Sequence, residues 1–357
     1  MVSAEAFFSP DYETARARFR AAAERAGARL DALPLHATSP RGQALSIDIA
    51  WFGPREPRRV LLHACGIHGL EAFTGSAVQL ALLDEPPRFA PDEAFILVHV
   101  LNPYGMAWLR RANENNVDLN RNFLADADSW SGAPALYGAL DPLLNPRSPP
   151  SRDAFGLRAA MTSFRYGFHR VKDAIAQGQY EYPQGLFFGG KALQPGPRRY
   201  LDWLRQHLQT AEYVFAIDLH TGLGKYGSDT VIPEMRVNVT PLETLAAALG
   251  RPLVDVSGPS VAYEVRGSMG AALPRALPHA RFDCVLQEIG TRGPLAVLHA
   301  LREENRWHFF GDGSIVHPAK QRLREALCPS AAKWRRDAVR LGVQLARAAA
   351  RWVHGRE

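Results

Sequence analysis

Two side chains in the segment GIHGLEAFTG, His68 and Glu71, have the types and the spacing to bind a divalent metal ion. A histidine and a glutamate three positions apart, at a turn that leads into a helix, can present an imidazole and a carboxylate on one side, which suits zinc. The pair alone is weak, because a chain with 12 histidines holds such a spacing by chance quite often. Its place after the apolar run at 60–64 strengthens the interpretation.

A metal ion held by only two protein ligands would be weakly bound, so a third ligand is expected from elsewhere in the chain. His220 ends the apolar run at 213–220 and is followed by Thr221 and Gly222. A histidine in this position is also compatible with a capped residue of the core. His63 and His99 lie within apolar runs, and we interpret them as structural.

The segment at 101–123 is rich in groups that bind anions or orient metal ligands. Arg110, Arg111 and Arg121 can form forked hydrogen bonds with carboxylates, and Asn120 adds amide donors. Asp118 is suited to orient an imidazole that binds a metal. A solvated loop with capping side chains is the alternative, but so many polar groups together favour a site.

Glu288 lies at the end of the apolar run at 283–290, close to Gly290. A carboxylate in this position is poorly explained as a core residue, and beside a metal it could act as a general base. A surface glutamate at the end of a strand is the alternative interpretation.

These candidate residues need strands and helices that bring distant segments together. Apolar or alternating runs predict strands at 44–52, 60–64, 94–102, 213–220 and 283–290. Helical stretches are predicted at 12–32, 241–249, 294–305 and 331–353. Continuous apolar strands that alternate with helices predict an α/β fold whose sheet is covered on both faces. In such a sheet, functional groups gather beyond the carboxyl ends of the strands.

We expect a single catalytic domain over residues 1–357, because the candidate residues span 68–288 and must meet in one place. Residues 124–212 form the least regular part of the chain and are predicted to be an insertion. The stretch at 331–353 predicts a C-terminal helix with a basic, solvated face.

The composition is that of a globular protein, with 46% hydrophobic and 22% charged residues. The net charge is +6, but the basic residues are spread along the chain, which argues against nucleic-acid binding. The three cysteines have no metal-like spacing and are expected to be reduced thiols. The sequence has neither a membrane-spanning run nor the pattern of a secretory signal, so we expect a cytoplasmic protein without a membrane partner.

Taken in order, the segments GIHGLE, NPYG, VDLNRNF, DLHTG and LQEIGT resemble the motifs of the zinc carboxypeptidase superfamily. The chain looks most like a bacterial branch known only as a domain of unknown function. The DLHTG segment is also similar to the succinylglutamate desuccinylase and aspartoacylase branch. The resemblance implies a zinc carboxypeptidase-like fold, an α/β architecture with a mixed central sheet and helices on both faces.

The resemblance also implies one zinc ion bound by His68, Glu71 and His220. In this family, a carboxylate in the position of Asp118 orients the first histidine. Carboxypeptidase A itself has a catalytic His₂Glu zinc site.

Five further residues receive roles from the resemblance. Arg111 would stabilise the oxyanion, and Glu288 would act as general base and then as general acid. Asn120 and Arg121 would bind the terminal carboxylate of the substrate. Tyr263 would correspond to a mobile tyrosine of the family.

The function expected from this sequence is zinc-dependent cleavage of an amide bond. A metallocarboxypeptidase that releases the C-terminal amino acid of a small peptide is the first hypothesis. An N-acyl amino acid deacylase is the alternative, because Asn120 and Arg121 could bind the free carboxylate of such a substrate as well. An inactive metal-binding regulatory protein is a third hypothesis, and the presence of Glu288 and Arg111 argues against it.

Overall fold

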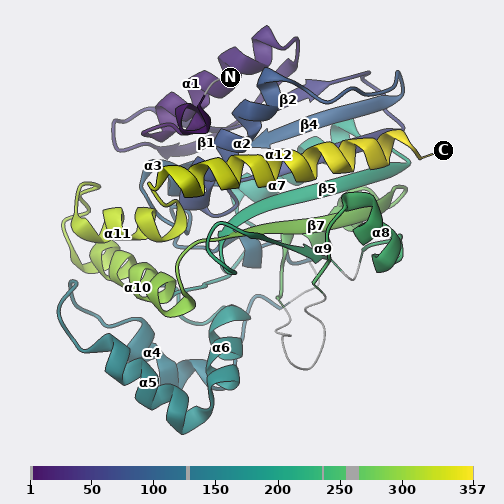
Figure 1. The fold of residues 1–357 in the computed structure, drawn as a ribbon. Helices are drawn as coiled ribbons and strands as arrows, with labels where there is room; N and C mark the ends of the chain where they lie inside the picture. Colours follow the sequence, from purple (N-terminus) through teal and green to yellow (C-terminus); the bar gives the residue numbers. More distant parts are fainter. Residues whose placement is uncertain (1–2, 126–128, 235–236, 255–264, 357) are drawn as a thin grey trace.

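The structure is a computed structural model that describes residues 3–125, 129–234, 237–254 and 265–356. Within these residues, seven strands form one mixed sheet in the order β1-β2-β4-β3-β5-β7-β6 (Figure 1). The central strands β4, β3, β5 and β7 run parallel, and β1, β2 and β6 pair antiparallel. The strands are β1 (Arg29–Thr38), β2 (Ala44–Phe52), β3 (Arg59–Cys65), β4 (Glu93–His99), β5 (Tyr213–Gly222), β6 (Asp229–Pro233) and β7 (Arg281–Gly290).

The central strands are buried along nearly their whole length, as their apolar runs predict. Every residue of β5 is buried, and so is every residue of β4. Such strands need helices on both faces of the sheet, because neither set of alternating side chains can face water. The predicted α/β fold with a mixed central sheet is confirmed.

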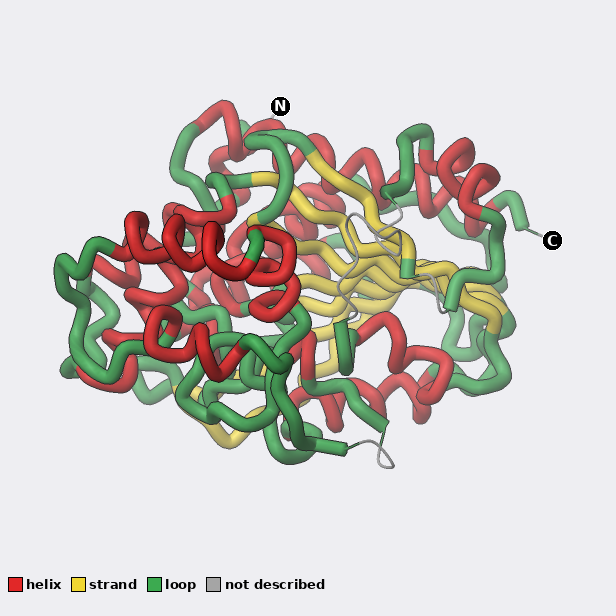
Figure 2. Tube along the Cα trace, turned by 90° about the horizontal axis from the view of Figure 1, so that it is seen from below, coloured by secondary structure: helices red, strands yellow, loops and turns green. Residues whose placement is uncertain are grey.

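Two layers of helices provide this cover (Figures 1 and 2). On one face, Phe215 and Ile217 of β5 belong to a core cluster with residues of α1 (Tyr12–Arg25), α2 (Ala72–Asp84), α8 (Leu242–Leu249) and α12 (Ala332–His354). On the other face, Val214 and Ala216 pack with residues of α7 (Pro195–His207) and α9 (Met269–Ala276). Successive residues of β5 therefore point alternately into two separate cores.

Further helices lie beyond the carboxyl ends of the central strands (Figure 1). Leu70 and Ile289, which lie close to the candidate residues, share a core cluster with Leu301 and Leu323. These helices are α3 (Pro103–Ala107), α10 (Pro294–Phe310) and α11 (Pro318–Leu327).

In its described part, residues 124–125 and 129–212, the predicted insertion contains three helices that precede α7. They are α4 (Tyr137–Leu144), α5 (Phe155–Tyr166) and α6 (Phe168–Ala176). Tyr137, Leu140 and Ile175 belong to the small core that these helices form among themselves. The group projects from the lower end of the molecule in Figure 1.

Two features of the N-terminal region and the sheet edge differ from the sequence prediction. The predicted helix at 12–32 is too long, because α1 ends at Arg25 and the chain turns at Gly27, which has a φ of +78°. Residues 29–32 instead begin β1. The short strand β6 was not predicted, because three of its five residues are only partly buried and the segment carries no clear apolar pattern.

The three cysteines Cys65, Cys284 and Cys328 are free and buried. None of the helices in the described parts of the chain has the length and apolar character needed to cross a membrane.

Candidate metal centre

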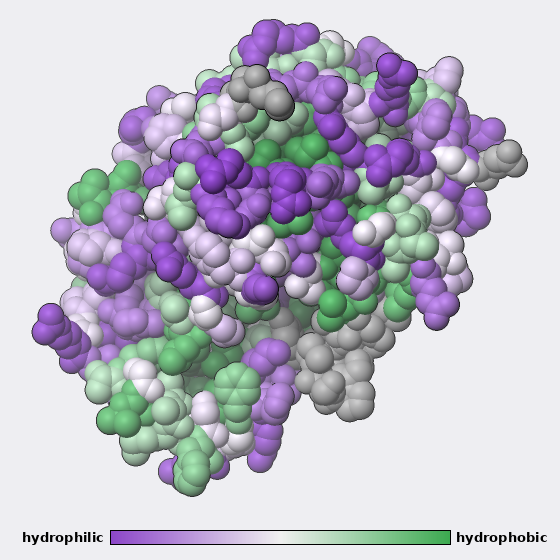
Figure 3. Space-filling model, viewed as in Figure 1, coloured by the Kyte–Doolittle hydropathy of each residue, from purple (hydrophilic) through white to green (hydrophobic). Residues whose placement is uncertain are grey.

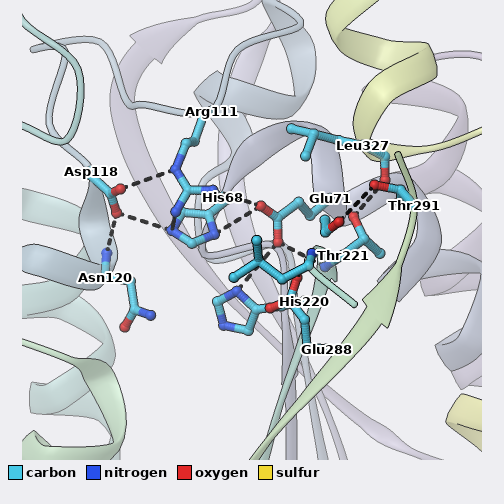
Figure 4. A network of polar contacts seen from close by, with 12 residues as sticks. His68, Glu71, Arg111, Asp118, Asn120, His220, Thr221, Glu288, Thr291 and Leu327 are labelled. Atoms are coloured by element: carbon cyan, nitrogen blue, oxygen red, sulfur yellow. Dashed lines mark hydrogen bonds and ion pairs between the residues drawn. The ribbon is translucent and has the colours of Figure 1, made fainter. Parts of the chain in front are cut away.

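The candidate metal ligands meet at the carboxyl ends of β3 and β5 (Figure 4). Nδ1 of His68 lies 3.0 Å from Oε1 of Glu71, and Nδ1 of His220 lies 3.3 Å from Oε2 of the same carboxylate. Potential ligand atoms of the three side chains all lie within 4.8 Å of one another, and all three residues are buried. Residues from two distant segments of the chain, 68–71 and 220, thus form one cluster.

The turn that carries His68 and Glu71 is held in place by the neighbouring segment at 102–111. Gly69 N donates to the carbonyl of Arg111, and Leu70 N donates to that of Arg110. Gly69 and Gly105 lie so close that an ideal Cβ on Gly69 would be 2.0 Å from the carbonyl carbon of Gly105. Glycine is needed at this crossing because no side chain fits between the two backbones.

A carboxylate contacts the outer nitrogen of each histidine. Oδ1 of Asp118 lies 3.0 Å from Nε2 of His68, and Oδ2 of Asp218 lies 2.7 Å from Nε2 of His220. A carboxylate accepts the Nε2 proton of an imidazole and thereby directs the lone pair of Nδ1 to the opposite side. In both residues, Nδ1 is the nitrogen that faces Glu71.

The donor set fits a zinc ion, because one of its buried nitrogen atoms lies beside a carboxylate without a hydrogen bond. Nδ1 of His68 is buried and has no hydrogen-bond partner among the described residues, although Glu71 lies beside it. Two groups that both present lone pairs do not bond to each other, but a cation between them would satisfy both. Two imidazole nitrogens and one carboxylate are a common ligand set of catalytic zinc.

Arg111 links the ligand cluster to the carboxylate of Asp118. Its Nη1 donates to Oε1 of Glu71 at 2.9 Å, and its Nε donates to Oδ2 of Asp118 at 3.1 Å. Its Nη2 lies 2.8 Å from Nε2 of His68. The ring of Phe187 lies 5.4 Å from the guanidinium carbon, which is a cation–π distance.

Burial and charge act in opposite directions on the pKa values of these groups. Burial raises the pKa of Glu71, but the nearby His68, His220 and Arg111 outweigh burial, so the net pKa is lowered. For His220, burial lowers the pKa, but the contacts with Asp218 and Glu71 together outweigh burial, and the net pKa lies well above the ordinary value. The cluster therefore favours an ionised carboxylate at neutral pH.

Glu288 lies directly beside His220, because the two residues pair in register on the parallel strands β5 and β7. Its Oε1 accepts a hydrogen bond of 2.8 Å from Leu223 N. Burial, and then the negative charge of Glu71, raise the pKa of Glu288 to about 7. A carboxyl group with a pKa near neutrality can both take up and release a proton under physiological conditions.

Asn120 also lies near the cluster, but Arg121 is engaged elsewhere. Asn120 N donates to Oδ1 of Asp118 at 3.0 Å, and Oδ1 of Asn120 accepts from Met269 N at 3.0 Å. The guanidinium of Arg121 donates to the backbone carbonyls of Asn120 and Ala176. In this conformation, Arg121 supports the backbone of the site.

Two other candidates do not join the cluster. Arg110 is buried and pairs with Glu304 of α10 at 3.0 Å, so it joins the segment at 102–111 to α10. Tyr263 lies outside the described residues.

Sequence reasoning missed Asp218 and two backbone amides. Thr221 N donates to Oε2 of Glu71 at 3.0 Å, and Leu223 N holds Glu288 as described. The alternation of side chains along a strand was the available signal for Asp218, because residues two apart on β5 share a face. No sequence signal indicates the two amides, since they depend on how β5 ends.

The sequence matches the model of a family over residues 8–340, which is more than nine-tenths of the chain. That family is described as "Protein of unknown function (DUF2817)". The chain belongs to this family. None of the curated proteins matches the sequence of this DUF2817 member.

Solved structures similar to this DUF2817 protein include metallocarboxypeptidases. A chain in the structure of bovine thrombin-activatable fibrinolysis inhibitor in complex with tick carboxypeptidase inhibitor is 12% identical, with a TM-score of 0.52 and 97% of each chain covered. Carboxypeptidase A from Helicoverpa armigera is 15% identical, with a TM-score of 0.47 and coverage of 96% of this chain and 74% of that chain. A metallo-carboxypeptidase from Burkholderia cenocepacia is 11% identical, with a TM-score of 0.48 and coverage of 96% and 68%. The first of these shows that the fold is shared, and the predicted carboxypeptidase-like fold is confirmed.

Proposed function

We propose that this protein is a zinc-dependent hydrolase that cleaves an amide bond, and that it acts as a metallocarboxypeptidase. The observation that carries the proposal is the convergence of His68, Glu71 and His220 beside Glu288. Two histidines, one carboxylate and a separate carboxyl group of near-neutral pKa are the parts that metal-assisted hydrolysis requires.

The ligands of the proposed zinc ion are His68 and His220, through Nδ1, and Glu71. A bound zinc ion acidifies water and polarises a carbonyl group, which is the chemistry it would supply at this site. Asp118 and Asp218 hold the two imidazoles in the orientation that this role needs.

Glu288 is the proposed general base and acid. Its carboxylate removes a proton from the attacking water and then delivers a proton to the leaving amine. A pKa of about 7 suits both transfers, because each form of the carboxyl group is well populated at neutral pH.

Arg111 and Asn120 are the proposed binding groups on the side of the site formed by the segment at 102–123. The guanidinium of Arg111 stabilises negative charge on the carbonyl oxygen of the substrate. Asn120 binds the terminal carboxylate. Arg121 joins it when its guanidinium turns from the backbone carbonyls toward the substrate. Tyr263 is assigned to the substrate side through the resemblance to the family.

Metal content and substrate class test the proposal directly. We expect one equivalent of zinc in the purified protein, and we expect chelation to abolish hydrolysis. Turnover of peptides with a free C-terminus, and little turnover of N-acyl amino acids, supports the carboxypeptidase assignment. The reverse preference would assign a deacylase, and full activity of the metal-free protein would exclude a zinc mechanism.

Glu288→Gln separates catalysis from metal binding. Glutamine keeps the oxygen that accepts from Leu223 N but cannot exchange a proton. We expect the variant to keep its zinc while kcat falls about 10²- to 10⁴-fold, the usual contribution of a general base. Undiminished turnover in this variant would show that another group is the base.

A further inference from the structure

Four large apolar side chains of α5 and α6 face solvent. Leu157 is 65% exposed, Met161 63%, Phe164 94% and Phe168 60%. We call these four residues the outer stripe. Apolar residues gather at the lower end of the molecule in Figure 3, where Figure 1 places these helices. Large apolar side chains gathered on one surface usually mark a binding surface.

The outer stripe is not needed for the packing of the insertion. Leu157, Met161 and Phe164 follow the i, i+4, i+7 spacing of one helix face, and Phe168 begins the next helix. Other residues of α5 and α6 make the contacts with the rest of the protein. Phe155 stacks on His299 of α10, with ring centroids 5.0 Å apart, and Ile175 of α6 packs into the small core of the insertion.

The chain around the outer stripe is strongly basic. Residues 147–170 contain five arginines and one acidic residue, so this short segment carries a net charge of +4 out of +6 for the whole chain. All five arginines, which are Arg147, Arg152, Arg158, Arg165 and Arg170, are exposed. The acidic residue, Asp153, accepts hydrogen bonds from Arg302 and Arg306 of α10.

We propose that the outer stripe and its arginines bind the surface of an anionic lipid bilayer. Exposed Leu, Met and Phe side chains beside arginines are the pattern of helices that lie in a membrane interface. The apolar side chains enter the acyl boundary, and the arginines contact lipid phosphates. This proposal departs from the expectation, drawn from the sequence, that the protein has no membrane partner.

Charge argues against a second copy of this chain as the occupant. An isologous contact would place two segments of charge +4 against each other, and residues 147–170 offer only Asp153 as an acidic partner. Asp153 is already engaged with the arginines of α10. An anionic partner therefore matches the positive charge of residues 147–170. The four projecting apolar side chains favour a lipid over other anionic partners.

Vesicle sedimentation of the full-length protein tests this proposal. We expect binding to vesicles of phosphatidylglycerol and phosphatidylcholine, weak binding to pure phosphatidylcholine, and loss of binding at high salt. Phe164→Ser should weaken binding about tenfold, since a fully exposed phenylalanine loses its burial in lipid. Arg165→Gln combined with Arg170→Gln should weaken it by a similar or larger factor, at about fivefold for each charge.

Val316→Ser is the matched control, because Val316 is 77% exposed and lies outside the outer stripe. It should leave vesicle binding unchanged. Each variant should unfold at the same temperature as the wild type, since the substituted side chains make few contacts. Chelation should not alter vesicle binding, which separates this proposal from the proposed zinc hydrolase.

Three results would overturn the proposal. The first is no sedimentation with anionic vesicles, and the second is equal binding to both vesicle types. The third is a stable dimer that Phe164→Ser converts to a monomer, which would assign the outer stripe to a second copy.

Discussion

Asp218 has a larger effect on the pKa of His220 than Glu71, the other carboxylate that raises it. Most buried histidines lose their proton, because burial disfavours the charged form. His220 is buried, yet its pKa is raised by the contact with Asp218 at 2.7 Å. The same contact fixes the ring so that Nδ1 faces Glu71. The carboxylate thus controls both the orientation and the basicity of the proposed ligand.

Asp218→Asn should lower the zinc affinity about 10- to 100-fold, as loss of a carboxylate behind a ligating histidine usually does. A competition titration with a chelating dye measures the affinity without reference to activity. Asp48→Asn is the control, because Asp48 is also a buried and paired carboxylate, but it lies on β2 and pairs with Arg16 and Arg20 of α1. Equal zinc affinity of the wild type and Asp218→Asn would show that Asp218 does not support zinc binding.

At the scale of elements, the site depends on the crossing of two loops that follow parallel strands. The chain after β3 carries His68 and Glu71, and the chain after β4 leads to Arg111. Val100, at the end of β4, has a φ of +60°, which is unusual for a β-branched residue. Leu101 N and Asn102 N then bond to the carbonyls of Cys65 and Gly66. The two loops are therefore held against each other by backbone contacts.

Gly69→Ala should disrupt this crossing, because the new Cβ would overlap the backbone of Gly105. We expect a loss of about 2–4 kcal/mol in the free energy of unfolding, at or above the usual cost of overpacking, and a loss of bound zinc. Gly156→Ala in α5 is the control, since its Cβ meets nothing within 4 Å. Urea denaturation of both variants compares the two sites, and equal stabilities would contradict the argument.

At the scale of the whole molecule, the helical layer that includes α1 and α2 buries titratable side chains of the sheet. His63 of β3 and His99 of β4 are fully buried. Burial lowers the pKa of His63 to about 4 and that of His99 to about 3. His99 stacks on Phe19 of α1, with ring centroids 4.2 Å apart, and so belongs to the cover of the sheet.

The free energy of unfolding should therefore fall as the pH drops below about 6.5, the ordinary pKa of histidine. In the unfolded chain these residues take up protons at that pH, whereas in the folded protein they stay neutral until about pH 4 for His63. Each histidine lowers the free energy of unfolding by about 1.4 kcal/mol per pH unit between its pKa in the unfolded chain and its pKa in the folded protein. Urea denaturation at pH 7 and pH 5 measures this fall in the free energy of unfolding. In the His63→Gln variant, the fall should be smaller by the contribution of His63. An unchanged difference in that variant would show that His63 is not one of the responsible groups.

The types of the residues at the ends of the apolar runs were sufficient to predict much of the candidate site. His68 and Glu71 follow the apolar strand β3, and His220 and Glu288 lie near the carboxyl ends of β5 and β7. A polar side chain at such a position is poorly explained as a core residue. The apolar runs themselves indicated a sheet covered on both faces, because only such a sheet buries every residue of a strand.

Only the tertiary structure decided which polar groups meet. The parallel register of β5 and β7 places Glu288 beside His220, and nothing within either segment specifies that pairing. Adjacent arginines likewise separate, since Arg110 turns to Glu304 and Arg111 turns to Glu71. Local sequence determines which side chains are available and which strands are buried. Which partner each side chain finds depends on contacts between distant segments, such as Arg110 and Glu304, which are 194 residues apart. These contacts exist only after the sheet and its helices have packed.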